Sequence, residues 1–219
     1  MKTKINGSPS FAYLDVKLEA GESIISESDA MSTMSADLDM KAQLNGSFFA
    51  ALAKKFLGGE SLFINTYSNN GRETKSMTLA QTTPGDMIEY SLNKNSLCLQ
   101  PGAFIASDEK VSLGLSYAGI LSFIAREGLF KLVVSGSGKI WFGSYGGIIE
   151  KDIDGEYIVD TSHLVAYEPQ LNMKMQLPNG FFGSFFSGEG LVTRIEGKGK
   201  IWIQSRSMSG LVSWLNPKL

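Results

Sequence analysis

Few residues in this sequence have side chains suited to acid–base or nucleophilic chemistry. His163 is the single histidine, and Asp160 and Ser162 stand beside it in the chain. A Ser-His-Asp triad is defined by geometry and often announced by a Gly-x-Ser-x-Gly turn, which the sequence lacks. A lone histidine without cysteine or a second histidine also lacks the spacing of a metal site. We therefore expect a structural histidine, with no catalytic residues, no metal and no cofactor.

Two other stretches suggest chemistry on first sight. Cys98 is the single cysteine and lies in an apolar run, so we expect a small buried hydrophobe rather than a reactive thiol. The segment 136–140, GSGKI, hints at a phosphate loop. Such a loop needs glycine where Val133 stands and Ser or Thr where Ile140 stands, and the hypothesis is rejected.

Three glutamates recur at corresponding places in the chain, namely Glu60, Glu127 and Glu189. Paired carboxylates catalyse acid–base reactions only when they lie close together, and residues in corresponding places of separate repeats lie far apart. We expect them to be structural, each binding backbone or an arginine such as Arg126 or Arg194.

The basic residues do not gather into a nucleic-acid surface. Lys139, Lys198 and Lys200 could form a basic ring in an oligomer, but the net charge is −2, with 20 basic and 22 acidic residues. Nucleic-acid binding needs clustered Lys and Arg that displace counterions. We expect solvated turns instead.

An internal repeat shows which elements must position these residues. Residues 127–144 read EGLFKLVVSGSGKIWFGS and residues 189–205 read EGLVTRIEGKGKIWIQS, so that Trp141 and Trp202 correspond. A weaker copy, ESLFINTYSNNG, begins at Glu60 and lacks the tryptophan. Upstream, we align Ile25-Ser26-Glu27 with Ile105-Ala106-Ser107 and Val165-Ala166-Tyr167. The prediction is one compact domain over 1–219 with three β repeats, at about 12–80, 81–148 and 149–207.

The local patterns favour strands and tight turns over helices. Lys139–Phe142 and Lys200–Ile203 are rich in β-branched and aromatic residues, which is typical of strands. We expect glycines to mark hairpin turns with positive φ, and these are Gly71, Gly136, Gly138, Gly197 and Gly199. Short helices are expected at 47–56 and 210–215. The predicted fold class is all-β.

The repeats contain apolar links whose phenylalanines could be either buried or exposed. They span 47–57, 117–125 and 180–188, and contain eight phenylalanines. Such rings must be covered by core, by other subunits, or by a membrane or protein partner. The third link is rich in glycine, and its phenylalanines are the candidate apolar contact: Phe181, Phe182, Phe185 and Phe186.

Four stretches together resemble a known family. They are SPSFAYLDVKLEAGESIISESDAMSTM, FLGGESLFINTY, the Pro84-Gly85-Asp86 turn and FFSGEGLVTRIEGKGKIWIQSRS. The chain resembles the bacterial and archaeal mitochondrial biogenesis factor-like family, related to the "altered inheritance rate of mitochondria" protein. The resemblance implies a fold like that of the tryptophan-attenuation RNA-binding protein. It implies three small β-sandwich units per chain and a homotrimer that closes a ring of nine. It brings no catalytic residues.

From these observations we expect a non-enzymatic oligomeric assembly or scaffold protein, with action at a membrane surface left open. The alternatives are a binding module for a small molecule or nucleic acid in the ring, and an enzyme with a site between repeats. No apolar segment of signal-peptide or membrane-spanning length occurs in the sequence, so a cytoplasmic location is expected, with peripheral membrane association as the open addition.

Overall fold

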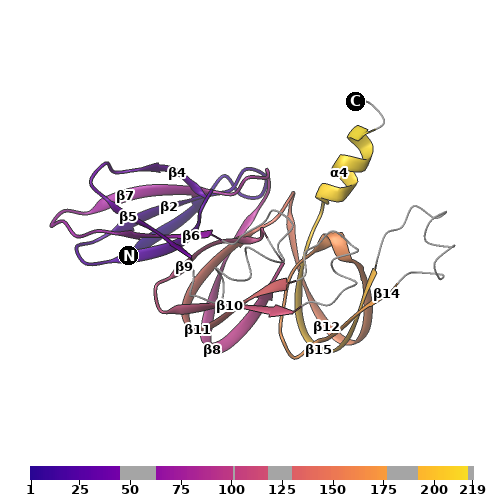
Figure 1. Cartoon of the computed structure of the whole chain (residues 1–219). Coiled ribbons are helices and arrows are strands. Elements are labelled where there is room, and N and C mark those ends of the chain that lie inside the picture. The colour runs from indigo at the N-terminus through magenta and orange to yellow at the C-terminus, as the bar shows by residue number, and fades with distance from the viewer. Residues whose placement is uncertain (45–62, 101, 118–129, 177–191, 217–219) are drawn as a thin grey trace.

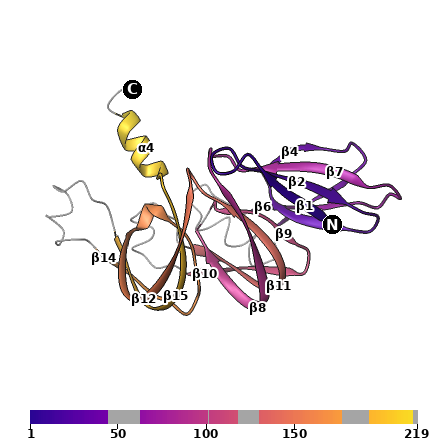
Figure 2. The same cartoon turned by 180° about the vertical axis from the view of Figure 1, so that it is seen from behind.

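The protein is built almost wholly of β-strands (Figures 1 and 2). The computed structural model describes residues 1–44, 63–100, 102–117, 130–176 and 192–216. Its strands are β1 (Lys2–Asn6), β2 (Tyr13–Leu18), β3 (Ser23–Glu27), β4 (Met31–Met34), β5 (Asp39–Leu44), β6 (Phe63–Ser68), β7 (Lys75–Ala80), β8 (Met87–Leu99), β9 (Phe104–Asp108), β10 (Val111–Tyr117), β11 (Phe130–Gly143), β12 (Ile148–Asp160), β13 (Leu164–Tyr167), β14 (Asn172–Gln176) and β15 (Val192–Gln204). The helical elements are the short turn η1 (Thr161–His163) and α4 (Met208–Leu215). The predicted all-β class is confirmed.

The strands form two open sheets. The smaller has the order β1-β2-β7-β4. The larger has the order β12-β15-β13-β8-β11-β9-β3-β6-β5, with β10 added on β11 and β14 on β15. The N-terminus and α4 lie at opposite ends of the molecule (Figures 1 and 2).

We divide the strands into three groups in chain order. The first strand group is β2–β7, the second is β8–β11 and the third is β12–β15. In each group three strands lie side by side in the same order, which we call the opening, closing and short strands. They are β2, β7 and β4 in the first group, β8, β11 and β9 in the second, and β12, β15 and β13 in the third. The long strands β8 and β11 of the second group correspond to pairs of shorter strands in the first, since β3 pairs with β6 and β2 with β7.

The pairing register locates one position in each closing strand. Thr78 lies between Asp15 and Thr33, Trp141 between Glu89 and Ala106, and Trp202 between Glu150 and Ala166. The ladder between closing strand and short strand shifts register beside this position in all three groups. This position therefore lies between the opening strand and the short strand in every group, but it carries threonine in the first group and tryptophan in the other two.

The predicted hairpin turns in the closing strands are wrong. Gly136 and Gly138 lie inside β11, and Gly197 and Gly199 lie inside β15, which runs through without a turn. Gly136, Gly138 and Gly197 do have positive φ, as expected, whereas Gly71 and Gly199 do not. At Gly199 an added Cβ would lie 2.9 Å from the terminal side-chain atoms of Glu168 and Gln170, which would have to shift.

The upstream alignment is also wrong for the first group. Ile25 and Ser26 pair with Ser107 and Ala106 across two neighbouring strands, so they do not occupy the same position in successive groups. The strand that corresponds to β9 and β13 is β4, since all three lie beside a closing strand with the same register shift. The expected helix at 47–56 lies outside the described residues. The expected C-terminal helix is α4, which starts two residues earlier than predicted, with Ser207 as its N-cap.

The apolar core consists of one cluster for each strand group. The first cluster, around Leu14, Val16 and Tyr67, also contains Trp141 of the second group. The second cluster contains Trp202 of the third group. Each tryptophan is therefore buried in the core of the preceding group. The third cluster is built from the third group and Cys98, and among the described residues no tryptophan of a following group enters it.

Candidate functional site

The tryptophan of the third group shows how one strand group joins the next. Trp202 is 1% exposed and packs edge-on against Tyr90 and Phe142, with ring centroids 5.4 and 5.9 Å apart. Its indole Nε1 donates a hydrogen bond of 3.0 Å to Glu150 Oε2. The aromatic contacts with Tyr90 and Phe142 join the third group to the second, whereas the hydrogen bond to Glu150 lies within the third group and satisfies the indole N–H.

Trp141 fills the corresponding place between the first and second groups. Its side chain is fully buried among Leu14, Val16 and Ile24. Unlike Trp202, its Nε1 has no hydrogen-bond partner among the described residues. The burial of both tryptophans means that each is part of a junction between groups rather than an exposed stacking surface.

The first group carries an open groove where the other two carry a filled junction. Thr78 takes the tryptophan position, and its Oγ1 donates a 3.0 Å hydrogen bond to Asp15 Oδ1. The groove has a volume of about 530 Å³ and is lined by Phe11, Ala12, Tyr13, Ser32, Thr78, Ala80 and residues 81–85. Phe11 is 74% exposed. The missing tryptophan of the first copy is visible in the sequence, whereas the groove beside Thr78 is visible only in the structure.

A side-chain oxygen at the end of each short strand, or directly after it, accepts a hydrogen bond from the closing strand. Ser35 Oγ accepts from the backbone N–H of Ser76 at 3.1 Å, and Asp108 Oδ2 accepts from that of Lys139 at 2.7 Å. Glu168 Oε2 accepts from the N–H of Lys200 at 2.9 Å. The sequence did contain a signal for the last two, since Asp108 is the last residue of β9 and Glu168 directly follows β13. Their role is structural, because the carboxylates satisfy backbone donors.

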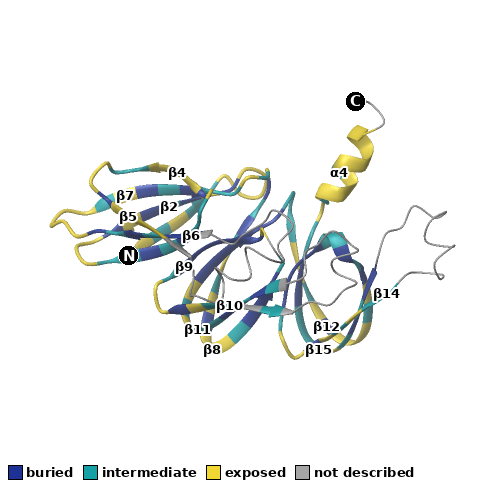
Figure 3. Cartoon of the chain, in the orientation of Figure 1, coloured by how far each residue is buried: buried dark blue, intermediate teal, exposed yellow. Residues whose placement is uncertain are grey.

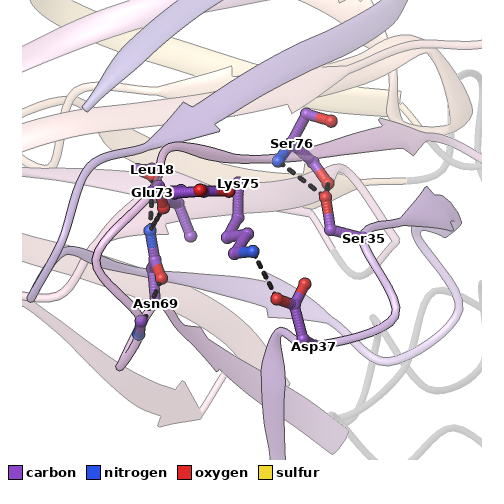
Figure 4. A network of polar contacts seen from close by, with 8 residues as sticks. Leu18, Ser35, Asp37, Asn69, Glu73, Lys75 and Ser76 are labelled. Atoms are coloured by element: carbon purple, nitrogen blue, oxygen red, sulfur yellow. Dashed lines mark hydrogen bonds and ion pairs between the residues drawn. The ribbon is translucent and has the colours of Figure 1, made fainter.

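In the first group a polar turn replaces the continuous strand (Figure 4). The buried Asn69 donates from Nδ2 to the carbonyl oxygens of Leu18 and Glu73, each at 2.8 Å. Lys75 forms an ion pair with Asp37, and this contact raises the pKa of Lys75 and lowers that of Asp37. The network closes the gap between β6 and β7, which in β11 is bridged by a continuous strand with a register shift between Gly136 and Ser137.

His163 is held in a structural arrangement. Its Nδ1 lies 2.7 Å from the carbonyl oxygen of Gln204, so that nitrogen carries the hydrogen and donates it. Asp160 Oδ1 accepts from the backbone N–H and hydroxyl of Ser162 and so caps η1. The serine hydroxyl therefore faces the aspartate and not the histidine, and the three residues do not form a triad.

A second titratable cluster lies at the junction of the second and third groups. Lys131 Nζ donates a 2.6 Å hydrogen bond to the hydroxyl of Tyr167 and lies 5.0 Å from its ring centroid. Cys98 is buried in the same core cluster as Tyr167. Burial raises the pKa of the Cys98 thiol and of the Tyr167 hydroxyl. Both groups stay protonated at neutral pH, which makes them poor nucleophiles.

The three lysines of the possible basic ring all face carboxylates. Lys139 lies 2.7 Å from Glu89, Lys200 pairs with Glu150, and Lys198 lies 3.2 Å from Asp154. The contact with Lys200 lowers the pKa of Glu150, and the hydrogen bond from Trp202 adds to the effect. Arg194 pairs with Glu156 and lies 3.6 Å from Glu196. The closing strands thus present charge pairs and not a row of free cations.

Several sequence-predicted residues lie outside the described residues. These are Glu60, Glu127, Glu189, Arg126 and all eight phenylalanines of the apolar links, including Phe181, Phe182, Phe185 and Phe186. Within the described ranges, no three His, Cys, Asp or Glu side chains gather closely enough to hold a metal ion. No helix in those ranges is both long and apolar enough to cross a bilayer.

The exposed large apolar side chains concentrate at the two ends of the molecule. Among the described residues they are Phe11, Tyr13, Met31 and Met40 near or in the first group, and Ile149, Ile158, Met208, Val212, Trp214 and Leu215 in the third group and α4. None belongs to the second group, which has a neighbouring group on either side. Figure 3 shows α4 exposed along its length and projecting from the body.

Comparison with known proteins gives one family. Residues 3–206 match the family described as Mitochondrial biogenesis AIM24. An uncharacterised protein from Streptococcus pyogenes serotype M6 is 29% identical over 217 residues, covering 95% of this chain and 87% of the relative. A crystal structure of a protein from Streptococcus pyogenes has a TM-score of 0.83 and 28% identity, covering 100% of this chain and 99% of that chain. These similarities agree in extending over the three strand groups.

Proposed function

The chain belongs to the mitochondrial biogenesis AIM24 family, and on that premise we propose that it is a non-enzymatic assembly protein that forms a ring-like homotrimer. In this proposal each chain contributes three β-sandwich repeats of the tryptophan-attenuation-protein type, and the ring contains nine. The observation that carries the proposal is the uneven exposure of apolar side chains, which is confined to the two end groups among the described residues.

The internal junctions supply the physical reason for assembly. On one side β9 pairs with β3 of the first group, and β13 pairs with the end of β8 of the second. The corresponding edges of β4 and β12 carry no strand within the described chain. Unpaired strand edges and exposed apolar side chains favour pairing with another chain.

The two open ends are different surfaces, so contact between copies is head to tail. Such a heterologous contact either closes a ring or grows a filament. The resemblance of the sequence to a family with nine-unit rings favours closure after three chains.

A scaffold role is supported by the use made of the reactive side chains. Asp160, Asp108 and Glu168 accept backbone hydrogen bonds, and His163 donates to a carbonyl. Glu150 is occupied by Lys200 and Trp202. These side chains stabilise junctions and turns, as expected for a protein with a structural role in an assembly.

Light scattering coupled to size-exclusion chromatography tests the proposal. We expect one species of three times 23.8 kDa at micromolar concentration. A mass equal to one chain would refute it, and a distribution of masses that grows with concentration would indicate a filament.

A further inference from the structure

Resting on the proposed head-to-tail assembly, we propose that α4 of one copy docks into the groove on the first strand group of the next copy. The groove is the one lined by Phe11, Tyr13 and Thr78, and the occupant is a second copy of this chain.

The groove lies on the face that is covered at both internal junctions. Trp141 and Trp202 project from the closing strand of one group into the core of the preceding group. Thr78 has the same strand neighbours but a much smaller side chain. When the first group of one copy meets the third group of another, this junction lacks a tryptophan at the groove, which has a volume of about 530 Å³ in the single chain. Unfilled apolar space at a contact costs stability, so a side chain from elsewhere would be favoured there.

The backbone contacts between groups show that α4 lies at the right end of the molecule. The segment before each group binds the segment before the next: Ala12 N–H donates to Gly85 O, and Asp86 N–H donates to Gly146 O. At the end of the third group, Ser205 N–H donates to Gly147 O and extends the β12–β15 ladder to the residues directly before α4. The first group of a following copy would enter at this point with its Phe11–Tyr13 segment. Continuation of the series thus places α4 beside the groove.

The side chains of α4 suit an apolar groove. Met208, Leu211, Val212 and Leu215 fall at i, i+3, i+4 and i+7, which places them on one face of the helix. Trp214 lies at the border of that face and is 60% exposed. The helix carries no charged residue, and Ser207 caps its N-terminus by accepting from Gly210 N–H at 3.1 Å. Trp214 would give the intermolecular junction the indole that Thr78 does not supply.

Cross-linking between copies tests the placement. The double variant Thr82→Cys, Ser213→Cys puts one thiol at the groove and one on α4, and the native Cys98 is buried. With a short bismaleimide we expect a ladder of covalent dimers and trimers on a denaturing gel. The control variant Met40→Cys, Ser213→Cys moves the first thiol to β5, outside the groove, and should remain a single band.

Two substitutions test the filling of the groove. Trp214→Ser should lower the fraction of three-chain species at least several-fold, whereas Met40→Ser, which removes another exposed apolar side chain, should leave it unchanged. Adding Thr78→Trp to the double-cysteine variant should fill the hollow from within and abolish the ladder.

The outcomes separate this inference from the proposed function. A three-chain mass with no ladder, or with equal ladders in the Thr82 and Met40 variants, overturns docking of α4 while the assembly stands. A one-chain mass overturns both. Flotation of the wild type with phosphatidylglycerol vesicles that Trp214→Ser abolishes, together with no ladder, would assign α4 to a membrane surface and overturn the inference.

Discussion

At the scale of single residues, the two buried tryptophans have the largest expected effect on stability. Trp141 and Trp202 each remove a large ring from water within the core of another strand group. Trp141→Ala and Trp202→Ala should each lower the free energy of unfolding by about 3–5 kcal/mol in denaturant melts. As a control, Trp214→Ala should cost less than about 1 kcal/mol in the unassembled chain, because α4 is exposed. Near-neutral effects at Trp141 and Trp202 would contradict the packed junction.

The acid response of Glu150 gives a second prediction at this scale. The pKa of Glu150 is lowered in the folded state, chiefly by the contact with Lys200. The ionised carboxylate therefore stabilises the fold at pH values above the ordinary pKa of 4.5. That contribution is lost as the pH falls through the folded pKa. Because the Glu150 side chain is 46% exposed, solvent screening limits it to about 1 kcal/mol or less.

Thermal melts of Glu150→Gln and wild type should therefore differ at pH 7 and converge in acid. Asp154→Asn is the matched control, since Asp154 also pairs with a lysine of β15 but is largely exposed. A difference in melting temperature between Glu150→Gln and wild type that increases in acid would mean that the carboxylate does not stabilise the fold in this way.

At the scale of elements, the segment between the first and second groups depends on close backbone approach. A Cβ on Gly85 would lie 1.8 Å from the carbonyl oxygen of Ser144, so Gly85→Ala must push the two segments apart. We expect a loss of about 1–3 kcal/mol in unfolding free energy. Gly114→Ala on β10 is the control, because its added Cβ would meet Val133 O at an ordinary 3.7 Å. Equal unfolding free energies of the two variants would argue against a close backbone contact between Gly85 and Ser144.

The elements also show what the sequence could and could not predict. Strand type followed from β-branched and aromatic runs, and the repeated Gly-Lys-Ile-Trp correctly marked two corresponding strands. The prediction of hairpin turns at these glycines was wrong because a glycine inside a long strand looks the same in the sequence as a glycine in a turn, and Gly136, Gly138 and Gly197 even share the positive φ of turn glycines. The pairing of Ile25 with Ser107 depends on contact between groups, which no local pattern encodes.

The candidate site was predictable only in part for the same reason. The burial of Trp141 and Trp202 suits their apolar strands, but the groove at Thr78 arises from the absence of a side chain. The groove beside Thr78 can be related to the missing indole ring only when the three closing strands are compared in the structure. Asp108 and Glu168 directly follow the aligned stretches 105–107 and 165–167, but their role in accepting from the N–H groups of Lys139 and Lys200 became clear only from the structure.

At the scale of the whole molecule, the outer edge of β12 should be the other half of the contact between copies. The corresponding end of β8, Leu97–Leu99, is buried because β13 pairs with it. On β12 the same region carries Ile158, which is 55% exposed. A head-to-tail neighbour would cover it with β4, so Ile158→Lys places a charge at a buried edge. Charges on an edge strand oppose strand pairing, and their burial without a partner is costly.

Sedimentation velocity can distinguish an effect on assembly from an effect on folding. We expect Ile158→Lys to shift the three-chain species to single chains while the circular dichroism spectrum and melting temperature of the chain remain those of a folded β protein. Met40→Lys, an equally drastic change at an exposed residue of β5, should leave the sedimentation coefficient unchanged. If Ile158→Lys stays fully assembled, the edge of β12 lies outside the contact and copies must meet through another surface. If both variants dissociate, the loss reflects general surface charge rather than the pairing of β12 with β4.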